Sequence, residues 1–217
     1  MRGFIDGEYQ DGPLRGCTFV AGERGMGKTT LVANLLSVCD GGVMFFDPLA
    51  RHESLLPGRK LFFQPGPLQE YLRINRERRF KVLYQPRDGD IDEHFRALCL
   101  IARAFGRMIF AVDELDMFCG PRWGDRRMPP CFYDLVNYGR HAQVSMIATA
   151  RYPMSVPRGF TSQCAQMYLF HETEPDHITY FRRYIGSADA LSLSALEKYQ
   201  YLHWNGDGPA QLCGGRR

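Results

Sequence analysis

The segment from Gly22 to Thr30 limits the fold of this chain more than any other feature. It reads GERGMGKTT, and its first eight residues match the pattern GxxxxGK[ST] at every fixed position. A short apolar run, Cys17 to Ala21, precedes it, and from Lys28 onward apolar residues recur with helical spacing, so it is expected to join a buried strand to a helix. Its glycines let backbone N–H groups and the helix N-terminus point at an anion. The pattern predicts a phosphate-binding loop; the alternative is an ordinary glycine-rich turn.

The residue types in this loop are those that hold ATP and Mg²⁺. The residues expected to contact the nucleotide are Gly22, Glu23, Arg24, Gly25, Met26, Gly27, Lys28, Thr29 and Thr30. The Lys28 ammonium would reach the terminal phosphates and act in catalysis, and the Thr29 hydroxyl would bind Mg²⁺. ATP and Mg²⁺ are therefore the expected ligands.

A second apolar run, Met108 to Val112, ends in two adjacent carboxylates, Asp113 and Glu114. Ligands of open parallel sheets bind beyond the C-terminal ends of the strands, so both carboxylates should lie beside the loop. Asp113 is expected to hold the Mg²⁺ water shell, and Glu114 to orient and deprotonate the attacking water. The alternative is that the pair caps the start of a helix. Asp116 is expected to be a solvated or capping residue.

A third apolar run, Val144 to Thr149, also ends in a polar side chain. The Thr149 hydroxyl would lie where a hydrogen bond can sense the γ-phosphate, which gives it a catalytic role. Threonine also favours strands for packing reasons alone, so a structural role is the alternative.

Apolar runs of strand length alternate with helical patterns along the chain. This alternation predicts an α/β fold, a mainly parallel central sheet flanked by helices. The expected strands are 17–21, 43–46, 61–63, 82–85, 108–112, 144–149, 166–170 and 201–204. The expected helices begin at Lys28, with Gly41 and Gly42 as a left-handed C-cap, and elsewhere cover 71–81, 94–105, 132–141, 176–184 and 188–198. We expect one domain over 1–217, with a core at about 15–171, C-terminal helices and a strand at 172–205, and a short tail at 206–217.

Composition narrows the function further. A net charge of +3 argues against a strongly basic nucleic-acid coat protein. The seven cysteines are scattered, without the spacing of a zinc site, which fits a reduced, cytosolic chain. The N-terminus lacks the apolar core of a signal peptide, and no run approaches the roughly 18 apolar residues of a membrane span. A soluble protein is therefore expected.

The order of these motifs resembles the RecA-like, additional-strand P-loop ATPases, and within them the FtsK and HerA family of DNA pumps. The stretch Val43 to Pro48 (VMFFDP) is similar to that family's second strand, which ends in Asp-Pro. The stretch Tyr138 to Pro153 (YGRHAQVSMIATARYP) is similar to the family's Arg-bearing helix end, apolar strand and Thr-Gln-Arg-Pro ending. Ala150 stands where Gln is usual, which moves a sensor role to Thr149. The small size of the chain resembles the genome-packaging ATPases of tailless icosahedral viruses with an internal membrane. The resemblance covers roughly residues 15 to 205.

Through this resemblance, Arg140 matches the catalytic arginine that one subunit contributes to the ATP of its neighbour, with Arg151 as a second candidate. Such an arginine implies a homo-oligomeric ring, expected to be a hexamer. The other implied partners are double-stranded DNA, bound without sequence preference, and a capsid vertex or membrane-associated packaging protein. The implied location is the cytoplasm of the host cell or the packaging vertex of the virion. The alternative for Arg140 is a helix-terminal residue that interacts with the helix dipole or a surface carboxylate.

The segment from Cys119 to Pro130 carries three arginines and a tryptophan between chain breakers. Because it follows the carboxylate pair, Arg122, Arg126 and Arg127 are candidates for contacts with DNA phosphates that do not read bases. A solvated surface loop or a subunit contact is the alternative. A second basic cluster, whose alternative is a wet helix face, comprises Arg73, Arg76, Arg78 and Arg79.

The sequence thus predicts an ATPase that hydrolyses ATP to ADP and phosphate to move double-stranded DNA into a viral capsid. Two alternatives stay open. One is a cellular HerA-like or conjugation-type DNA translocase. The other is a switch that binds ATP to hold an assembly together and pumps nothing.

Overall fold

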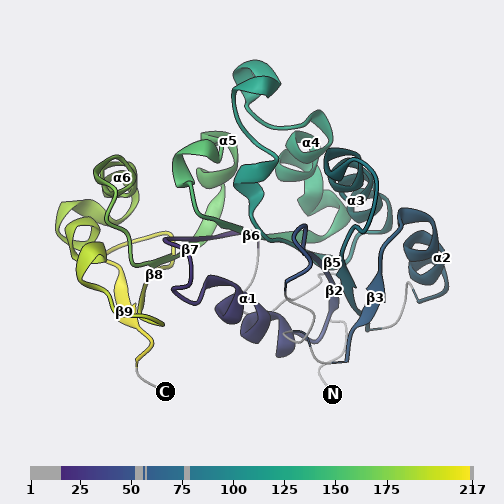
Figure 1. Cartoon of the computed structure of the whole chain (residues 1–217), viewed down its shortest axis with the longest axis horizontal. Helices are drawn as coiled ribbons and strands as arrows, with labels where there is room; N and C mark the ends of the chain where they lie inside the picture. Colours follow the sequence, from purple (N-terminus) through teal and green to yellow (C-terminus); the bar gives the residue numbers. More distant parts are fainter. Residues whose placement is uncertain (1–15, 52–55, 57, 76–78, 216–217) are drawn as a thin grey trace.

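A single twisted sheet organises the chain (Figure 1). The computed structural model describes residues 16–51, 56, 58–75 and 79–215. Within these residues the sheet has nine strands in the order β3-β4-β2-β5-β6-β1-β7-β8-β9. Their bounds are β1 Cys17–Ala21, β2 Gly42–Phe46, β3 Lys60–Phe62, β4 Lys81–Tyr84, β5 Met108–Val112, β6 Val144–Ala150, β7 Cys164–Phe170, β8 Tyr201–Trp204 and β9 Gln211–Cys213.

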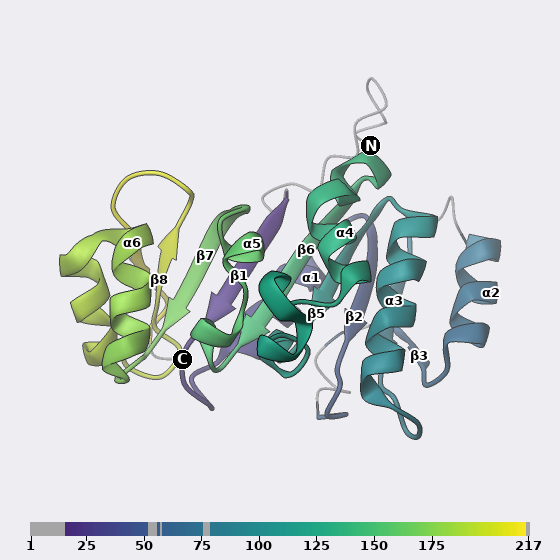
Figure 2. The same ribbon diagram turned by 90° about the horizontal axis from the view of Figure 1, so that it is seen from above.

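The sheet is parallel from β3 to β7, and β8 and β9 continue it antiparallel. Strand β6 lies between β1 and β5, as Figure 2 shows. This is the additional strand expected from the resemblance, inserted between the strand of the phosphate-binding loop and the strand of the two carboxylates. The segments that follow β1, β5 and β6 therefore meet at one edge of the sheet, and the predicted α/β class is confirmed.

The helices are distributed unequally over the two faces of the sheet. Their bounds are α1 Lys28–Ser37, α2 Pro65–Asn75, α3 Ile91–Phe105, α4 Pro130–Tyr138, α5 Arg158–Thr161 and α6 Pro175–Ser192. Buried residues of α2 to α6 form one hydrophobic cluster with the sheet, and those of α1 form a second cluster on the other face; Figure 1 shows α1 below the strands and the other helices above. Strands β5 and β6 are buried along their whole length, which explains why the sequence of β5 is wholly apolar and that of β6 is interrupted only by Ser145 and Thr149.

Short 3₁₀ turns connect several of the longer elements. They are η1 Leu115–Met117, η2 Pro121–Arg126, η3 Gly139–Ala142, η4 Pro153–Ser155 and η5 Leu193–Ala195. Among the described residues, no helix combines the length and the apolar character needed to span a membrane.

Several element boundaries differ from the sequence predictions. Helix α1 ends at Ser37 with Val38 as a right-handed cap, so the expected glycine C-cap is wrong. Gly42 instead opens β2, where a Cβ atom would lie 2.6 Å from the Phe80 ring. Helix α2 begins at Pro65 and ends at Asn75, earlier than the charged segment suggested.

The C-terminal third differs most. The two helices expected at 176–184 and 188–198 are present within α6, on either side of the non-helical Gly186, but helical structure ends at η5, before the predicted end at Lys198. The expected tail contains β9, whose residues are exposed or half-buried. A short edge strand of this kind buries too little apolar surface to leave a clear pattern in the sequence.

Candidate active site

The phosphate-binding loop lies between β1 and α1, as predicted. Gly22 has φ 135°, and a Cβ atom there would lie 2.7 Å from the Cβ of Phe170 on the neighbouring strand. Gly27 has φ 112° and precedes the first helical residue. Arg24 and Gly25 at the tip are exposed. Gly22 and Gly27 are therefore required by their positive φ and by the close approach of the Phe170 and Tyr199 side chains.

The Lys28 side chain bonds back to the start of its own loop. Its side chain is 7% exposed, and its ammonium donates to the carbonyl oxygens of Gly22 at 2.7 Å and Glu23 at 2.9 Å. Burial lowers the pKa of Lys28, while Glu114 and Asp113 oppose that shift because they favour the charged form. An ammonium has three N–H groups, so one remains for a phosphate oxygen.

The Asp113 carboxylate joins the loop to the strand beside it. Its Oδ1 accepts a hydrogen bond from the Thr149 hydroxyl at 2.7 Å and from the Thr29 hydroxyl at 3.3 Å. Asp113 and Thr29 thus offer adjacent oxygen atoms, the ligand type that Mg²⁺ prefers, and Mg²⁺ usually completes its shell with waters and substrate phosphates. The described residues contain no cluster of three or more His, Cys, Asp or Glu side chains that could hold a metal ion. A magnesium ion shared with a nucleotide fits this donor set.

Thr149 bridges the two acidic residues. Its hydroxyl donates to Asp113 and accepts from the backbone N–H of Glu114 at 2.9 Å. These contacts give Thr149 a positioning role at the end of β6. Its role as a γ-phosphate sensor stays a prediction.

Glu114 has an unusual backbone and a charged partner. Its φ of 55° lies in the left-handed region, which costs a non-glycine residue on the order of 1–3 kcal/mol and is common at functional sites. The side chain is 14% exposed, and its Oε2 accepts from Nε of Arg151 at 2.5 Å. The Glu114 carboxylate is therefore fixed at the edge of the sheet, beside the Lys28 loop.

Asp116 is half-buried behind this pair, and its Oδ1 accepts from the backbone N–H of Arg151 at 3.4 Å. Burial, and secondarily repulsion from Glu114, raises the pKa of Asp116. The residue caps the turn that carries Arg151, as the capping expectation requires.

Glu114→Gln is expected to retain ATP binding and to lower hydrolysis by roughly 10² or more, because an amide cannot take a proton from water. Phosphate release and nucleotide affinity are measured on the same preparation. Glu70→Gln serves as a matched control, since it is the same change at an exposed glutamate of α2 that pairs with Arg73. An equal loss of affinity and turnover in Glu114→Gln would show that Glu114 supports the structure of the site instead.

Segments from the C-terminal third also contact the loop, and the sequence analysis did not find them. Glu23 donates its N–H to the carbonyl of His171 and accepts at Oε1 from the N–H and hydroxyl of Thr173. The N–H of Tyr199 donates to the carbonyl of Met26 at 3.0 Å. These are contacts between distant parts of the chain, and only the order of strands in the sheet could have indicated them.

The structure places Arg140 and Arg151 at opposite ends of strand β6. Arg140 is exposed in η3, just before β6 begins, whereas Arg151 follows β6 and pairs with Glu114 in the same chain. Arg140 therefore lies away from its own loop by the length of a seven-residue strand, about 20 Å.

The arginines proposed to contact DNA are exposed but not equivalent. Arg122 forms an ion pair with Asp92 at 2.9 Å and also donates to the carbonyl of Met117. The Arg126 guanidinium lies 4.5 Å from the centre of the Tyr133 ring. Arg127 ends the turn η2 in a left-handed conformation. Residues 121–126 extend from the face of the sheet that α2 to α6 cover (Figure 1).

The second basic cluster is only partly described. Arg73 pairs with Glu70, and Arg79 pairs with Asp40. Arg76 and Arg78 lie outside the described residues. The two visible pairs fit a solvated surface.

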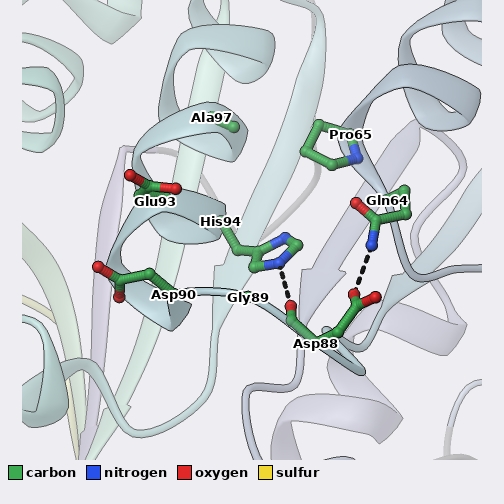
Figure 3. Close-up of a pocket in the computed structure, with 8 residues that line it drawn as sticks. All are labelled: Gln64, Pro65, Asp88, Gly89, Asp90, Glu93, His94 and Ala97. Atoms are coloured by element: carbon green, nitrogen blue, oxygen red, sulfur yellow. Dashed lines mark hydrogen bonds between the residues drawn. The ribbon is translucent and has the colours of Figure 1, made fainter.

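A separate hollow of about 500 Å³ lies at the ends of β4 and α3, and Figure 3 shows Gln64 and His94 pointing at Asp88 within it. His94 is satisfied: Nε2 donates to the carbonyl of Asp88 at 2.7 Å, and Nδ1 accepts from the Tyr84 hydroxyl at 2.5 Å. Three acidic side chains line the hollow, Asp88, Asp90 and Glu93. Their charge disfavours phosphate, so this hollow is distinct from the candidate active site.

No protein-family model matches the sequence, and no curated protein matches it. Solved structures do match. The genome packaging NTPase B204 from Sulfolobus turreted icosahedral virus 2, in complex with AMPPCP, aligns with a TM-score of 0.71 at 15% identity over 93% of this chain and 97% of its own. The DNA-packaging ATPase B204 from Sulfolobus Turreted Icosahedral Virus aligns with a TM-score of 0.69 at 15% identity over 93% and 98%. VirB4 of Thermoanaerobacter pseudethanolicus aligns with a TM-score of 0.66 at 10% identity over 95% and 91%. The match to genome-packaging ATPases expected from the sequence is therefore confirmed at the level of structure, and the chain has the fold that B204 and VirB4 share.

Proposed function

We propose that the chain is an ATP-driven double-stranded DNA translocase that acts as a viral genome-packaging motor. The observation that carries this proposal is the convergence of Lys28, Asp113 and Glu114 at one edge of a sheet with the B204 fold. B204 is a DNA-packaging ATPase and has been solved with AMPPCP. The shared fold, together with this convergence of site residues, supports the same class of activity.

Each residue has a defined task in this proposal. The loop amides and Lys28 bind the phosphates of ATP, and Thr29 and Asp113 hold Mg²⁺, which when bound neutralises phosphate charge. Glu114 accepts a proton from the attacking water as the water bonds to the γ-phosphorus and the bond to ADP breaks. Arg151 orients the Glu114 carboxylate. The Thr149 hydroxyl fixes the Asp113 carboxylate and the Glu114 backbone N–H relative to each other.

The proposed assembly is a homo-oligomeric ring, a hexamer, around double-stranded DNA. In this proposal Arg140 acts on the ATP of a neighbouring subunit, because its side chain is exposed in η3, at the opposite end of β6 from its own phosphate-binding loop. A capsid vertex or a membrane-associated packaging protein would recruit the ring, in the host cytoplasm or at the packaging vertex of the virion.

ATP hydrolysis with and without double-stranded DNA, measured together with the mass in solution, tests this function. We expect turnover to rise when DNA of any sequence is added, and the active species to have the mass of a ring. Binding of ATP without turnover would instead support an assembly switch.

The second candidate is a cellular HerA-like or conjugation-type translocase, which the structural match to VirB4 favours. Both candidates predict DNA-stimulated hydrolysis. They differ in whether the gene lies beside capsid genes.

Replacing Arg126 and Arg127 by Ala is expected to lower affinity for all DNA sequences alike. The salt dependence of binding should flatten by about 0.9 for each phosphate that the variant no longer neutralises. Arg122→Ala is the internal comparison, with a smaller effect because its guanidinium is already paired with Asp92. Affinity is measured by fluorescence anisotropy over a series of salt concentrations, and hydrolysis without DNA should match that of the parent chain. Unchanged DNA affinity in the double variant would identify this segment as an ordinary surface loop.

A further inference from the structure

Tyr199 lies directly against the phosphate-binding loop. A Cβ atom at Gly27 would lie 2.6 Å from Cδ1 and 3.1 Å from Cε1 of the Tyr199 ring. The Tyr199 N–H donates to the carbonyl of Met26 at 3.0 Å. The ring therefore covers the Cα of Gly27, immediately before the lysine that faces the phosphates.

The turn that carries Tyr199 is fixed by its own contacts. Tyr199 has φ 68°, a left-handed conformation that is uncommon for a non-glycine residue. The N–H of Gln200 donates to the carbonyl of Glu197 at 3.0 Å, and the Gln200 side chain accepts from the N–H of Glu197 at 2.8 Å. Gly214 passes so close that a Cβ atom there would collide with the Tyr199 carbonyl. The ring is thus placed by the backbone as a firm surface beside the loop.

The order of the strands puts Tyr199 on the side of the loop opposite to the hydrolytic residues. Strand β1 has β6 and then β5 on one side, where Thr149, Asp113 and Glu114 lie, and β7 and then β8 on the other. Tyr199 precedes β8. Because the terminal phosphate must face Glu114 for hydrolysis, the nucleoside end of an extended triphosphate leaves the loop toward β7 and β8.

Part of the Tyr199 ring is open to a ligand. The residue is 40% exposed although one side packs on Gly27. The ammonium of the exposed Lys198 lies 5.1 Å from the ring centre, so the π surface already has a partner that a flat aromatic group can replace.

We propose that Tyr199 binds the nucleobase of ATP by stacking, with Lys198 moved off the ring toward the phosphates. This inference rests on the proposed ATP-binding function of the loop and assigns it the surface that holds the base. Stacking uses a π face that every base has. The contact therefore supplies affinity for a nucleotide without selecting one base over another.

Binding of ATP and of inorganic tripolyphosphate, measured by calorimetry, tests the assignment, because tripolyphosphate has the phosphates without the base. Tyr199→Ala is expected to weaken ATP binding roughly tenfold, the scale of one base–aromatic stack, and to leave tripolyphosphate binding unchanged. Tyr199→Leu, which keeps an apolar cover over Gly27, should lose the same affinity for ATP. Tyr199→Phe should bind both ligands like the parent chain. Tyr138→Ala, at a tyrosine that is 53% exposed on α4, controls for the removal of a surface tyrosine.

Two outcomes would overturn the assignment while leaving ATP binding by the loop intact. In the first, Tyr199→Leu binds ATP like the parent. In the second, both ligands lose affinity equally, which would mean that Tyr199 only supports the loop. A parent chain that binds neither ATP nor tripolyphosphate would contradict the proposed function itself, and the assignment with it.

Discussion

Lys28→Ala is expected to lower the rate of ATP hydrolysis by roughly 10³ or more, because the site loses the cation that faces the developing phosphate charge. The Lys28 ammonium is held between the carbonyls of Gly22 and Glu23, so it is already in place before any charge develops. Nucleotide affinity should fall as well, since the same ammonium contacts the phosphates in the ground state. Phosphate release and calorimetric titration with ATP measure the two losses.

The matched control for this change is Lys60→Ala. Lys60 is an exposed lysine at the start of β3, at one end of the sheet, and its removal should leave turnover unchanged. Near-normal hydrolysis in Lys28→Ala would contradict the assignment of the loop as the phosphate site.

Arg140→Ala is expected to bind ATP almost normally and to hydrolyse it roughly 10³ to 10⁵ times more slowly, the effect of an arginine supplied by a neighbouring subunit. The loop, Thr29 and Asp113 come from the same chain as the bound nucleotide, so affinity does not depend on Arg140. The side chain is exposed before β6 and too far from Glu114 of its own chain to act there. Measured in parallel, ATP affinity should therefore stay near that of the parent chain while the turnover rate falls.

Mixing Arg140→Ala chains with Glu114→Gln chains sharpens this test. A mixed ring contains boundaries where an intact Glu114 site meets an intact Arg140 from the neighbour, and these should recover activity that neither variant has alone. If Arg140→Ala hydrolyses normally, or if co-assembled rings recover nothing, Arg140 is a structural residue. Arg151 would then be the remaining candidate, although its pairing with Glu114 in the same chain favours a role within one subunit.

The sequence predicted the central part of this fold because local chemistry determines it. Strands β1, β5 and β6 are buried along their whole length, so each is a mostly apolar run. The loop from Gly22 to Thr30 and the Asp113–Glu114 pair are short motifs whose residue types follow from phosphate and Mg²⁺ chemistry. Their convergence required only the rule that parallel strands end at the same edge.

The rest depends on contacts between distant segments. The Arg151–Glu114 pair, the hydrogen bonds that Thr149 makes to Asp113 and Glu114, and the packing of Tyr199 on Gly27 follow from which strands are neighbours. No local pattern states that order. Strand β9 was missed because an exposed edge strand of three residues has no apolar signature.

Displacement of a triplex-forming strand from double-stranded DNA is the most direct test of the central claim, because it reports movement along the duplex. The account predicts displacement that requires ATP, does not depend on the sequence between loading and triplex, and is absent with Glu114→Gln chains that still bind ATP. DNA-stimulated hydrolysis by a ring-sized assembly that displaces no triplex would contradict the claim that this ATPase moves DNA.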